Sequence, residues 1–203
     1  MTITLFHCHQ ARSMRPVWAL EEMGLEYDLK VLDFPPRVFN KEYKEINPLG
    51  TIPCMIDGDI KMTESAGICQ YLGDVYGPTP LAVTKDEHDY GFYLNWLHRS
   101  DATLTFPQTL VLRYTHHEPE ERKQPQVAED YKKWFLARLR SVEEAMETRT
   151  YLCADRFTMA DIAVGYAIHL ANSLGMATEF TPGIAAYFAR LQTRPAYQRA
   201  IDL

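Results

Sequence analysis

Residues 47–65 read NPLGTIPCMIDGDIKMTES and carry the pattern of a β-hairpin followed by a helix. Residues 52–56 are rich in β-forming side chains, and the Asp-Gly pair at 57–58 suits a two-residue type I′ turn. Residues 59–63 are therefore expected to pair back as a second strand. Pro53 donates no hydrogen bond to a sheet, so we expect it at the edge or at the first residue of its strand.

The end of the same stretch predicts a helix that begins at Glu64 and Ser65. The first N–H groups of a helix have no acceptor within the helix, and its positive dipole end favours a negative charge. A carboxylate is therefore the ligand that this position suits. Two interpretations stay open at this point: a small ligand-binding platform, or a hairpin with a purely structural role.

Composition places the chain among ordinary globular proteins. Its 203 residues are 46% hydrophobic and 24% charged, and the length allows one domain or two small ones. The net charge of −6, without a basic cluster, argues against binding to nucleic acid or to an anionic membrane surface. With neither a leader pattern nor a run of about 20 apolar residues, we expect a cytoplasmic protein.

Cysteines and histidines give no metal-binding pattern. The four cysteines lack CxxC or zinc spacing, which indicates buried reduced thiols rather than disulfides or a metal site. The seven histidines, including the adjacent His116 and His117, also lack ligand spacing. We therefore expect no metal.

The first part of the chain predicts a mixed α/β domain. Residues 3–6 form a strand pattern, and a helix follows from Ser13 to the closing Gly24. A second strand over residues 25–32 completes a βαβ unit with parallel strands. Residues 33–46 predict a short helix or an ordered loop. With the antiparallel hairpin and the helix from Ser65 to Tyr76, they complete a mixed four-stranded sheet covered by helices.

The rest of the chain predicts an all-helical domain. Gly-Pro-Thr-Pro at residues 77–80 is the best linker candidate, which divides the chain into domains at 1–77 and 86–203 joined by residues 78–85. Expected helices are residues 86–114, bent near Pro107, and then 126–149, 158–174, 182–191 and 196–201. On the second of these, one packed side is expected to contain Trp134, Phe135, Leu139, Val142 and Met146.

The helix over residues 158–174 is expected at the centre of its domain, because apolar residues surround its axis. Thr158 and Asp161 at its start form a capping-box pattern with Asp in place of Glu or Gln. Asp161 is therefore interpreted as a capping carboxylate that satisfies backbone donors, rather than as a catalytic acid.

In this order, Asn-Pro-Leu-Gly-Thr-Ile-Pro, Thr-Glu-Ser, a Pro linker and Phe-Thr-Met-Ala-Asp resemble the cytosolic glutathione transferases over essentially the whole chain. The resemblance implies a thioredoxin-like α+β N-terminal domain followed by an all-α domain. It also implies a cis peptide bond at Pro53, with the Ile52 backbone pairing with the cysteinyl part of glutathione. Glu64 and Ser65 would hold the γ-glutamyl amine and carboxylate, and Lys41 or Arg37 the glycyl carboxylate.

In that family the thiolate of glutathione is the nucleophile. Lowering a thiol pKa of about 8.5 by about two units requires roughly 2.7 kcal/mol of preferential thiolate stabilisation. Ser13 matches the serine position of the serine-dependent classes, and Arg12 lies where cysteine-bearing bacterial classes have their cysteine. The resemblance thus indicates a serine-site subgroup of bacterial type, in which Ser13 binds the thiolate and Arg12 adds positive charge.

Other roles remain open for the same residues. Ser13 is also a suitable N-cap, Arg12 a surface or dimer residue, and Cys8 a possible redox nucleophile. The pocket for the second substrate is expected between residues 7–12 and the first long helix, lined by His9, Phe106, Leu110 and Tyr114.

The sequence therefore predicts a homodimeric glutathione transferase. It would use glutathione as co-substrate and no metal, and it would join the thiolate to an electrophilic, mostly hydrophobic acceptor, or use it in ether cleavage or peroxide reduction. The alternatives are a non-catalytic binding or assembly protein of the same fold, and a glutathione-dependent thiol oxidoreductase that uses Cys8.

Overall fold

The computed structural model describes residues 2–203, which form two compact units. The first unit comprises residues 2–82 together with residues 192–203, and the second comprises residues 83–191. Residues 192–203 group in space with the first unit, whereas the sequence-based division assigns them to the second domain, residues 86–203.

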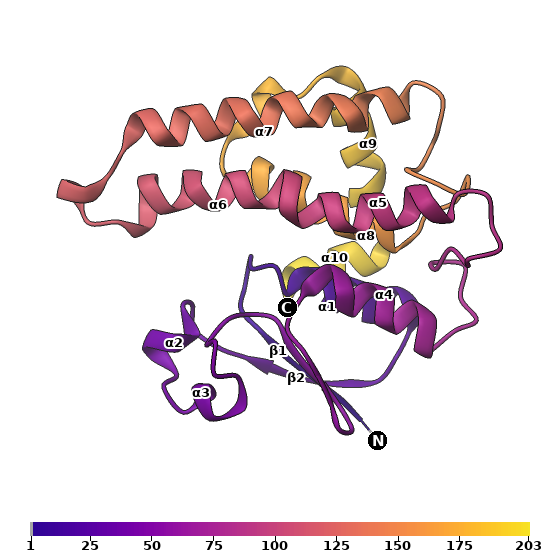
Figure 1. Ribbon diagram of the computed structural model, residues 1–203, viewed down its shortest axis with the longest axis horizontal. Coiled ribbons are helices and arrows are strands. Elements are labelled where there is room, and N and C mark those ends of the chain that lie inside the picture. Colours follow the sequence, from indigo (N-terminus) through magenta and orange to yellow (C-terminus); the bar gives the residue numbers. More distant parts are fainter. Residues whose placement is uncertain (1) are drawn as a thin grey trace. The chain divides into compact units, whose positions relative to one another are not determined.

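The first unit is built on a four-stranded mixed sheet with strand order β2-β1-β3-β4, as predicted. Strand β1 pairs in parallel with β2 and antiparallel with β3, which also pairs antiparallel with β4. Figure 1 shows α1, α4 and α10 gathered on one side of this sheet. The elements are β1 (Ile3–His7), α1 (Met14–Met23), β2 (Tyr27–Val31), α2 (Pro36–Phe39), α3 (Tyr43–Ile46), β3 (Cys54–Asp57), β4 (Ile60–Met62), α4 (Ser65–Val75) and α10 (Pro195–Asp202).

The predicted hairpin is present, but its turn lies one residue later than expected. Asp57 pairs with Ile60, so Gly58 and Asp59 are the two turn residues. Gly58 has a φ of 58°, whereas Asp59 is not among the described residues with positive φ. The predicted type I′ turn is therefore wrong, because a glycine at the first turn position with the only positive φ is the type II′ pattern.

Helix α10 is held against α1 by an aromatic pair and by ion pairs. The rings of Trp18 and Tyr197 meet edge to face with centroids 5.0 Å apart. Arg194 donates to both carboxylate oxygens of Glu22, at 2.5 and 2.8 Å. A bidentate pair of this kind fixes the relative orientation of the two side chains and adds stabilising energy. The C-terminal segment therefore supports α1, the first helix of the chain.

The second unit consists of helices. The predicted helix 86–114 is divided into α5 (Tyr90–Arg99), the π-helix η1 (Ser100–Thr105), α6 (Phe106–Leu112) and the π-helix η2 (Arg113–His117), so the irregularity begins before Pro107. Figure 1 shows α7 running alongside α6. The remaining elements are η3 (Glu120–Arg122), α7 (Pro125–Met146), α8 (Met159–Ser173), η4 (Met176–Glu179) and α9 (Pro182–Gln192).

One residue of the predicted packed side of α7 lies outside the core. Phe135, Leu139 and Val142 are buried as expected. Trp134 is 50% exposed, and the Arg138 guanidinium lies over its ring at 3.9 Å from the centroid. The prediction for Trp134 is wrong because an adjacent residue points about 100° away around a helix, and a cation–π contact satisfies this ring at the surface.

Helix α8 is the core of the second unit, and twelve of its residues are buried. Its capping box is confirmed: Thr158 Oγ1 accepts from Ala160 N at 3.3 Å, and the Asp161 carboxylate accepts from Thr158 N at 2.8 Å. Asp161 also accepts from Leu152 N at 3.0 Å and from the Tyr187 hydroxyl at 2.8 Å. Burial nevertheless raises the pKa of Asp161 to about 6.

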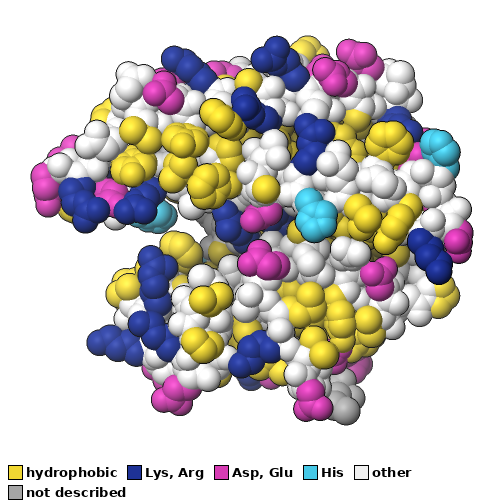
Figure 2. Space-filling model, in the orientation of Figure 1, with side chains coloured by type: hydrophobic (Ala, Val, Ile, Leu, Met, Phe, Trp, Pro, Cys, Tyr) yellow, Lys and Arg dark blue, Asp and Glu magenta, His cyan; other side chains and the backbone are white. Residues whose placement is uncertain are grey.

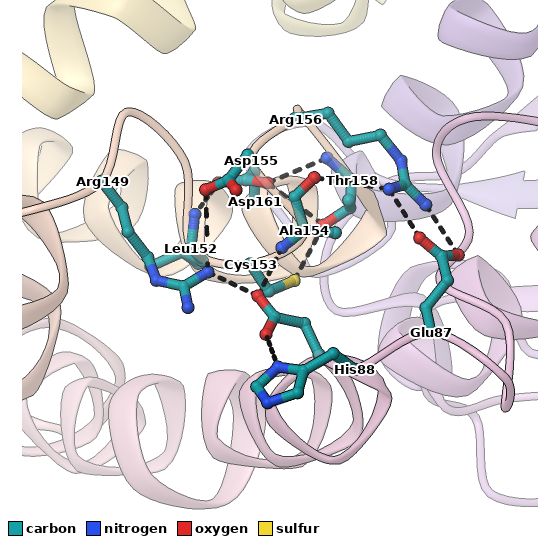
Figure 3. A network of polar contacts seen from close by, with 11 residues as sticks. Glu87, His88, Arg149, Leu152, Cys153, Ala154, Asp155, Arg156, Thr158 and Asp161 are labelled. Carbon is teal, nitrogen blue, oxygen red and sulfur yellow. Dashed lines mark hydrogen bonds and ion pairs between the residues drawn. The ribbon is translucent and has the colours of Figure 1, made fainter.

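A second polar network adjoins this cap (Figure 3). Arg149 pairs with Asp89 at 2.5 Å, and Arg156 pairs with Glu87 at 2.7 Å. The hydrogen bond from Arg156 is the main cause that lowers the pKa of Glu87 to about 2. A polar cavity of about 380 Å³ lies over these groups. Because the charges on its walls already pair with each other, we interpret the network as structural: it holds the loop that precedes α8 in place.

All four cysteines are buried and unpaired by disulfides, as predicted. No helix within residues 2–203 combines the length and the hydropathy needed to cross a bilayer.

We expect Asp161→Ala to lower the free energy of unfolding by about 3 kcal/mol or more, because it leaves the buried donors on Leu152, Thr158 and Tyr187 without an acceptor. Urea denaturation followed by circular dichroism measures this loss. Asp161→Asn keeps one acceptor oxygen and should lose less. Asp155→Asn, at a side chain that is 92% exposed, should change stability by less than about 0.5 kcal/mol. Equal losses for Asp161→Ala and Asp155→Asn would contradict the capping role.

Candidate functional site

The junction between β1 and α1 is organised by the Ser13 hydroxyl. Ser13 is fully buried, and its Oγ lies 2.9 Å from His7 Nδ1. The same oxygen accepts from Cys8 N at 3.2 Å and donates to Cys8 O at 3.3 Å. The alternative that Ser13 caps α1 with its side chain is wrong, because this hydroxyl makes no capping hydrogen bond.

His7 is buried at the end of β1, and burial is the main cause that lowers its pKa to about 4, with the charge of His9 second. The ring is therefore neutral at neutral pH. A neutral imidazole has one donor and one acceptor nitrogen, so the His7 tautomer decides whether Nδ1 donates to Ser13 Oγ, which leaves the single hydroxyl proton for Cys8 O, or accepts that proton itself. The two histidine rings meet edge to face at 5.8 Å.

The two other predicted residues of this loop are more accessible than Ser13. Arg12 is partly exposed immediately before α1, and His9 is exposed. Between them, Gln10 has a φ of 56°, a left-handed conformation that is uncommon for a residue other than glycine. Arg12 is therefore partly accessible beside the positive end of α1, whereas the Ser13 side chain is enclosed by the protein.

Cys8 is a poor candidate nucleophile. It is fully buried, and burial raises the pKa of its thiol to about 11, with the nearby charge of Asp33 as a second cause. Because the thiolate is the reactive form, a thiol that stays protonated at neutral pH is inert.

The loop before β3 is fixed by hydrogen bonds to one carbonyl group. The Tyr43 hydroxyl and Asn47 Nδ2 both donate to Thr51 O, at 2.8 and 2.9 Å. The Tyr43 ring also packs on Phe6 of the sheet at 5.2 Å. Ile52 follows, half-buried and ahead of the first residue of β3, so it lies outside the ladder.

The peptide bond between Ile52 and Pro53 is cis, as the resemblance implies. Gly50, two residues earlier, has a φ of 59°, and a Cβ at that position would lie 2.7 Å from Arg37 Cβ. Only glycine fits there, so α2 packs directly on this loop.

Two basic residues, Arg37 and Lys44, contact the same loop. Lys44 Cε lies 3.7 Å from the Cβ position of Gly50, and Arg37 is closer still. Lys41, the predicted ligand of the glycyl carboxylate, is exposed between α2 and α3. Figure 2 shows Lys and Arg side chains gathered over the part of the first unit that carries these two helices.

Helix α4 begins at the predicted position, with Glu64 as the N-cap residue in extended conformation. Glu64 is exposed, and its carboxylate forms no ion pair with any other residue between 2 and 203. Ser65 is buried, and its Oγ accepts from Nη1 of the fully buried Arg15 at 2.9 Å. An N-terminal serine, an exposed carboxylate and a guanidinium therefore meet at one helix end.

Three predicted residues of the acceptor pocket lie on one face of a helix in the second unit. Phe106 and Leu110 belong to α6 and Tyr114 to η2, at intervals of four residues. Phe106 is 53% exposed, and the other two are partly exposed. His9 belongs to the first unit, and its place in the same pocket stays a prediction.

Two residues of this region were missed by the sequence analysis, His7 and Arg15. Arg15 interrupts an otherwise apolar run of buried residues, from Met14 to Leu20, and that interruption was the available signal. His7 carried no signal of its own. Among residues 2–203, no group of three or more His, Cys, Asp and Glu side chains is arranged to hold a metal ion.

Comparison with known families identifies both parts of the chain. The family model "Glutathione S-transferase, N-terminal domain" matches residues 1–74, and "Glutathione S-transferase, C-terminal domain" matches residues 105–195. The chain therefore belongs to the glutathione S-transferase superfamily, with the thioredoxin-like first unit that the sequence predicts.

Individual relatives agree with this membership. Glutathione S-transferase 3 of Schizosaccharomyces pombe is 35% identical over 102 residues, which span half of this chain and 42% of that protein. GstA of Escherichia coli O157:H7 is 27% identical over 98% of this chain and 96% of its own. The solved structure of Ure2p5 from Phanerochaete chrysosporium, cocrystallized with 1-(S-glutathionyl)-2,4-dinitrobenzene, superposes with a TM-score of 0.85. It is 25% identical over 99% of this chain and 93% of that chain.

The lowered pKa of His7 predicts a specific pH dependence of stability. Since the folded pKa of about 4 lies below the ordinary 6.5, the unfolded chain binds more protons between these values, and stability falls as the pH is lowered through them. His7 should contribute a loss of about 2 kcal/mol between pH 7 and pH 5. Urea denaturation of the wild type and of His7→Asn at both pH values measures it. The same pH slope in both proteins would contradict the assignment.

Proposed function

We propose that this protein is a glutathione transferase that binds glutathione on its first unit and activates the thiol for attack on an electrophilic, mostly hydrophobic acceptor. The observation that carries the proposal is the start of α4, where exposed Glu64 adjoins Ser65 in a chain that matches both family domains. A helix N-terminus with a hydroxyl and an adjacent carboxylate suits the carboxylate and ammonium groups of an amino acid.

Each part of glutathione then has a proposed partner in the first unit. The N–H and hydroxyl of Ser65 hold the γ-glutamyl carboxylate, and Glu64 holds the γ-glutamyl amine. The backbone of Ile52, beside Pro53, pairs with the cysteinyl residue. Lys41 and Arg37 are the two predicted partners of the glycyl carboxylate, and the packing of Arg37 Cβ against Gly50 supports Arg37 for this role.

Thiolate stabilisation is proposed to come from the start of α1. Arg12 is partly exposed beside the positive end of α1, and its charge, the helix dipole and one hydrogen bond can together supply the roughly 2.7 kcal/mol that a two-unit lowering of the thiol pKa requires. The Ser13 hydroxyl is bonded to His7 and Cys8, so it would have to exchange its long bond to Cys8 O for a bond to sulfur. Ser13 and Arg12 therefore both remain proposed residues for thiolate stabilisation, and membership of a serine-site subgroup stays part of the proposal.

The reaction forms one bond from sulfur to the electrophilic carbon of the acceptor and releases a leaving group with the bonding electron pair. The thiol proton passes to solvent when glutathione binds, so no separate general base is needed. The conjugate cocrystallized with Ure2p5 is a product of this class, a glutathionyl group joined to a dinitrobenzene ring. Phe106, Leu110 and Tyr114 are the proposed apolar contacts for such a ring.

A redox function through Cys8 is less well supported, because the thiol is buried and its pKa is raised to about 11. A cytoplasmic location is part of our proposal, and the buried reduced cysteines agree with a reducing compartment.

Isothermal titration calorimetry with glutathione tests the proposal, and conjugation of a 1-halo-2,4-dinitrobenzene tests the chemistry. We expect Ser65→Ala to raise the Kd for glutathione about tenfold or more while sparing the pKa of the bound thiol, because the hydroxyl contacts a charged group distant from sulfur. Arg12→Gln should raise the thiol pKa, and it should spare the Kd measured below that pKa, where the bound thiol is protonated in both proteins. Thiolate absorbance against pH measures that pKa.

Ser13→Ala is the matched variant for thiol activation. A rise in the thiol pKa in Ser13→Ala, but not in Arg12→Gln, would assign activation to the hydroxyl. Absence of any binding heat or thiolate absorbance in the wild type would overturn the enzymatic proposal and leave an interaction role.

We also propose a homodimer, supported by apolar side chains that stay exposed around α2. Leu49 is 67% and Phe39 64% exposed; Phe39 belongs to α2, and Leu49 precedes Gly50, which packs against α2. Exposed apolar surface of this kind favours covering by a partner, here a second copy.

We expect Leu49→Asp to convert the dimer to a monomer, because it places a charge in an apolar interface. Sedimentation velocity measures the oligomeric state. Ile60→Asp, at a 47% exposed residue on β4, is the control and should leave the dimer intact. A monomeric wild type, or a dimer that persists in Leu49→Asp, contradicts this arrangement.

A further inference from the structure

Arg15 is a charged residue enclosed by the first unit. It lies in the first turn of α1, none of its surface is exposed, and its Nη1 donates to Ser65 Oγ at 2.9 Å. Fully buried arginines are rare in proteins, because removing a guanidinium from water is costly unless its donors are satisfied. This hydrogen bond joins residues that are 50 positions apart in sequence.

The hydrogen bond determines how the Ser65 hydroxyl is oriented. A guanidinium has donors only, whereas a hydroxyl has one proton and two acceptor lone pairs. Because Arg15 occupies one lone pair of Ser65 Oγ, the hydroxyl proton must point elsewhere. The hydroxyl is thus prepared as a donor before an anion arrives.

The charge of Arg15 also acts on the start of α4. Burial raises the pKa of Cys69, one turn beyond Ser65, to about 12, and the positive charge of Arg15 opposes that rise. Its field therefore extends along the first turn and adds to the positive end of the helix dipole. Both effects favour a negative group at the N-terminus of α4.

We propose that Arg15 is a positioning residue for the α-carboxylate of the γ-glutamyl group, acting through Ser65. The inference rests on the proposed function, since it concerns how the same site recognises glutathione. Arg15 does not touch the ligand; it holds the Ser65 hydroxyl in the donor orientation and supplies a fixed positive charge behind it. The site consequently selects thiol peptides whose first residue carries a free α-carboxylate, as a γ-glutamyl residue does.

A purely structural role for Arg15 makes a different prediction. If the guanidinium only joined α1 to α4, its removal would lower stability and weaken all ligands to the same extent. A positioning role instead weakens those ligands that carry the carboxylate. Ligand discrimination therefore separates the two roles.

The test compares glutathione with γ-aminobutyryl-cysteinyl-glycine, which is glutathione without that α-carboxylate, by isothermal titration calorimetry. In Arg15→Met the Kd for glutathione should rise about tenfold or more, while the Kd for the analogue stays within about twofold. The pKa of the bound thiol should not change. Arg194→Met removes a different arginine that supports α1, and it should leave the ratio of the two Kd values as in the wild type.

A double-mutant cycle tests whether Arg15 acts through Ser65. The effect of Ser65→Ala together with Arg15→Met should be close to that of the larger single change, because the two residues form one unit. If Arg15→Met fails to fold by calorimetric unfolding, Arg15→Lys replaces it, and a several-fold loss confined to glutathione is then expected, since an ammonium keeps the charge but not the planar donor geometry.

The outcomes are distinct. Equal weakening of both ligands, or fully additive effects in the cycle, overturns the positioning role while the proposed function stands. A wild-type protein that binds neither peptide overturns the proposed function and the inference with it.

Discussion

The arrangement of the first unit depends on the burial of α1. All residues from Met14 to Leu20 are buried, including Arg15, so every polar group at the start of this helix must find a partner inside the protein. Ser13 finds His7 and Cys8, and Arg15 finds Ser65. The residues that prepare the candidate site are therefore positioned by the same requirement that stabilises the helix.

The proposed site relies on two kinds of interaction, hydrogen bonds that fix the backbone and the positive potential of helix ends. On one side, hydrogen bonds from Tyr43 and Asn47 to the carbonyl of Thr51 hold the loop that precedes Pro53. On the other, helix ends provide positive potential, at α1 beside Arg12 and at α4 beside Ser65. We propose that the rigid backbone of this loop positions the peptide, and that the positive potential of the helix ends stabilises its charged groups, including the thiolate.

The sequence predicted those features that depend on short-range chemistry. The cap formed by Thr158 and Asp161 spans four residues, and it is present as expected. The sequence-based predictions were wrong where two possible local structures differ by a shift of one residue, or by which face of a helix packs into the core. The hairpin turn uses Gly58 and Asp59, and Trp134 is solvent-exposed beneath Arg138. Local pattern alone cannot rank these alternatives, because side-chain contacts decide between them.

By itself, the sequence determined the order of the elements, the mixed sheet, the buried helix of the second unit and the start of α4 at Ser65. These follow from periodicity, caps and turn residues, which act within a few positions. Only the tertiary structure decided that the Ser13 hydroxyl is enclosed, that α10 packs on α1, and that Arg15 meets Ser65. Such contacts join residues 50 or more positions apart, or depend on which groups packing removes from water, and no local pattern encodes either.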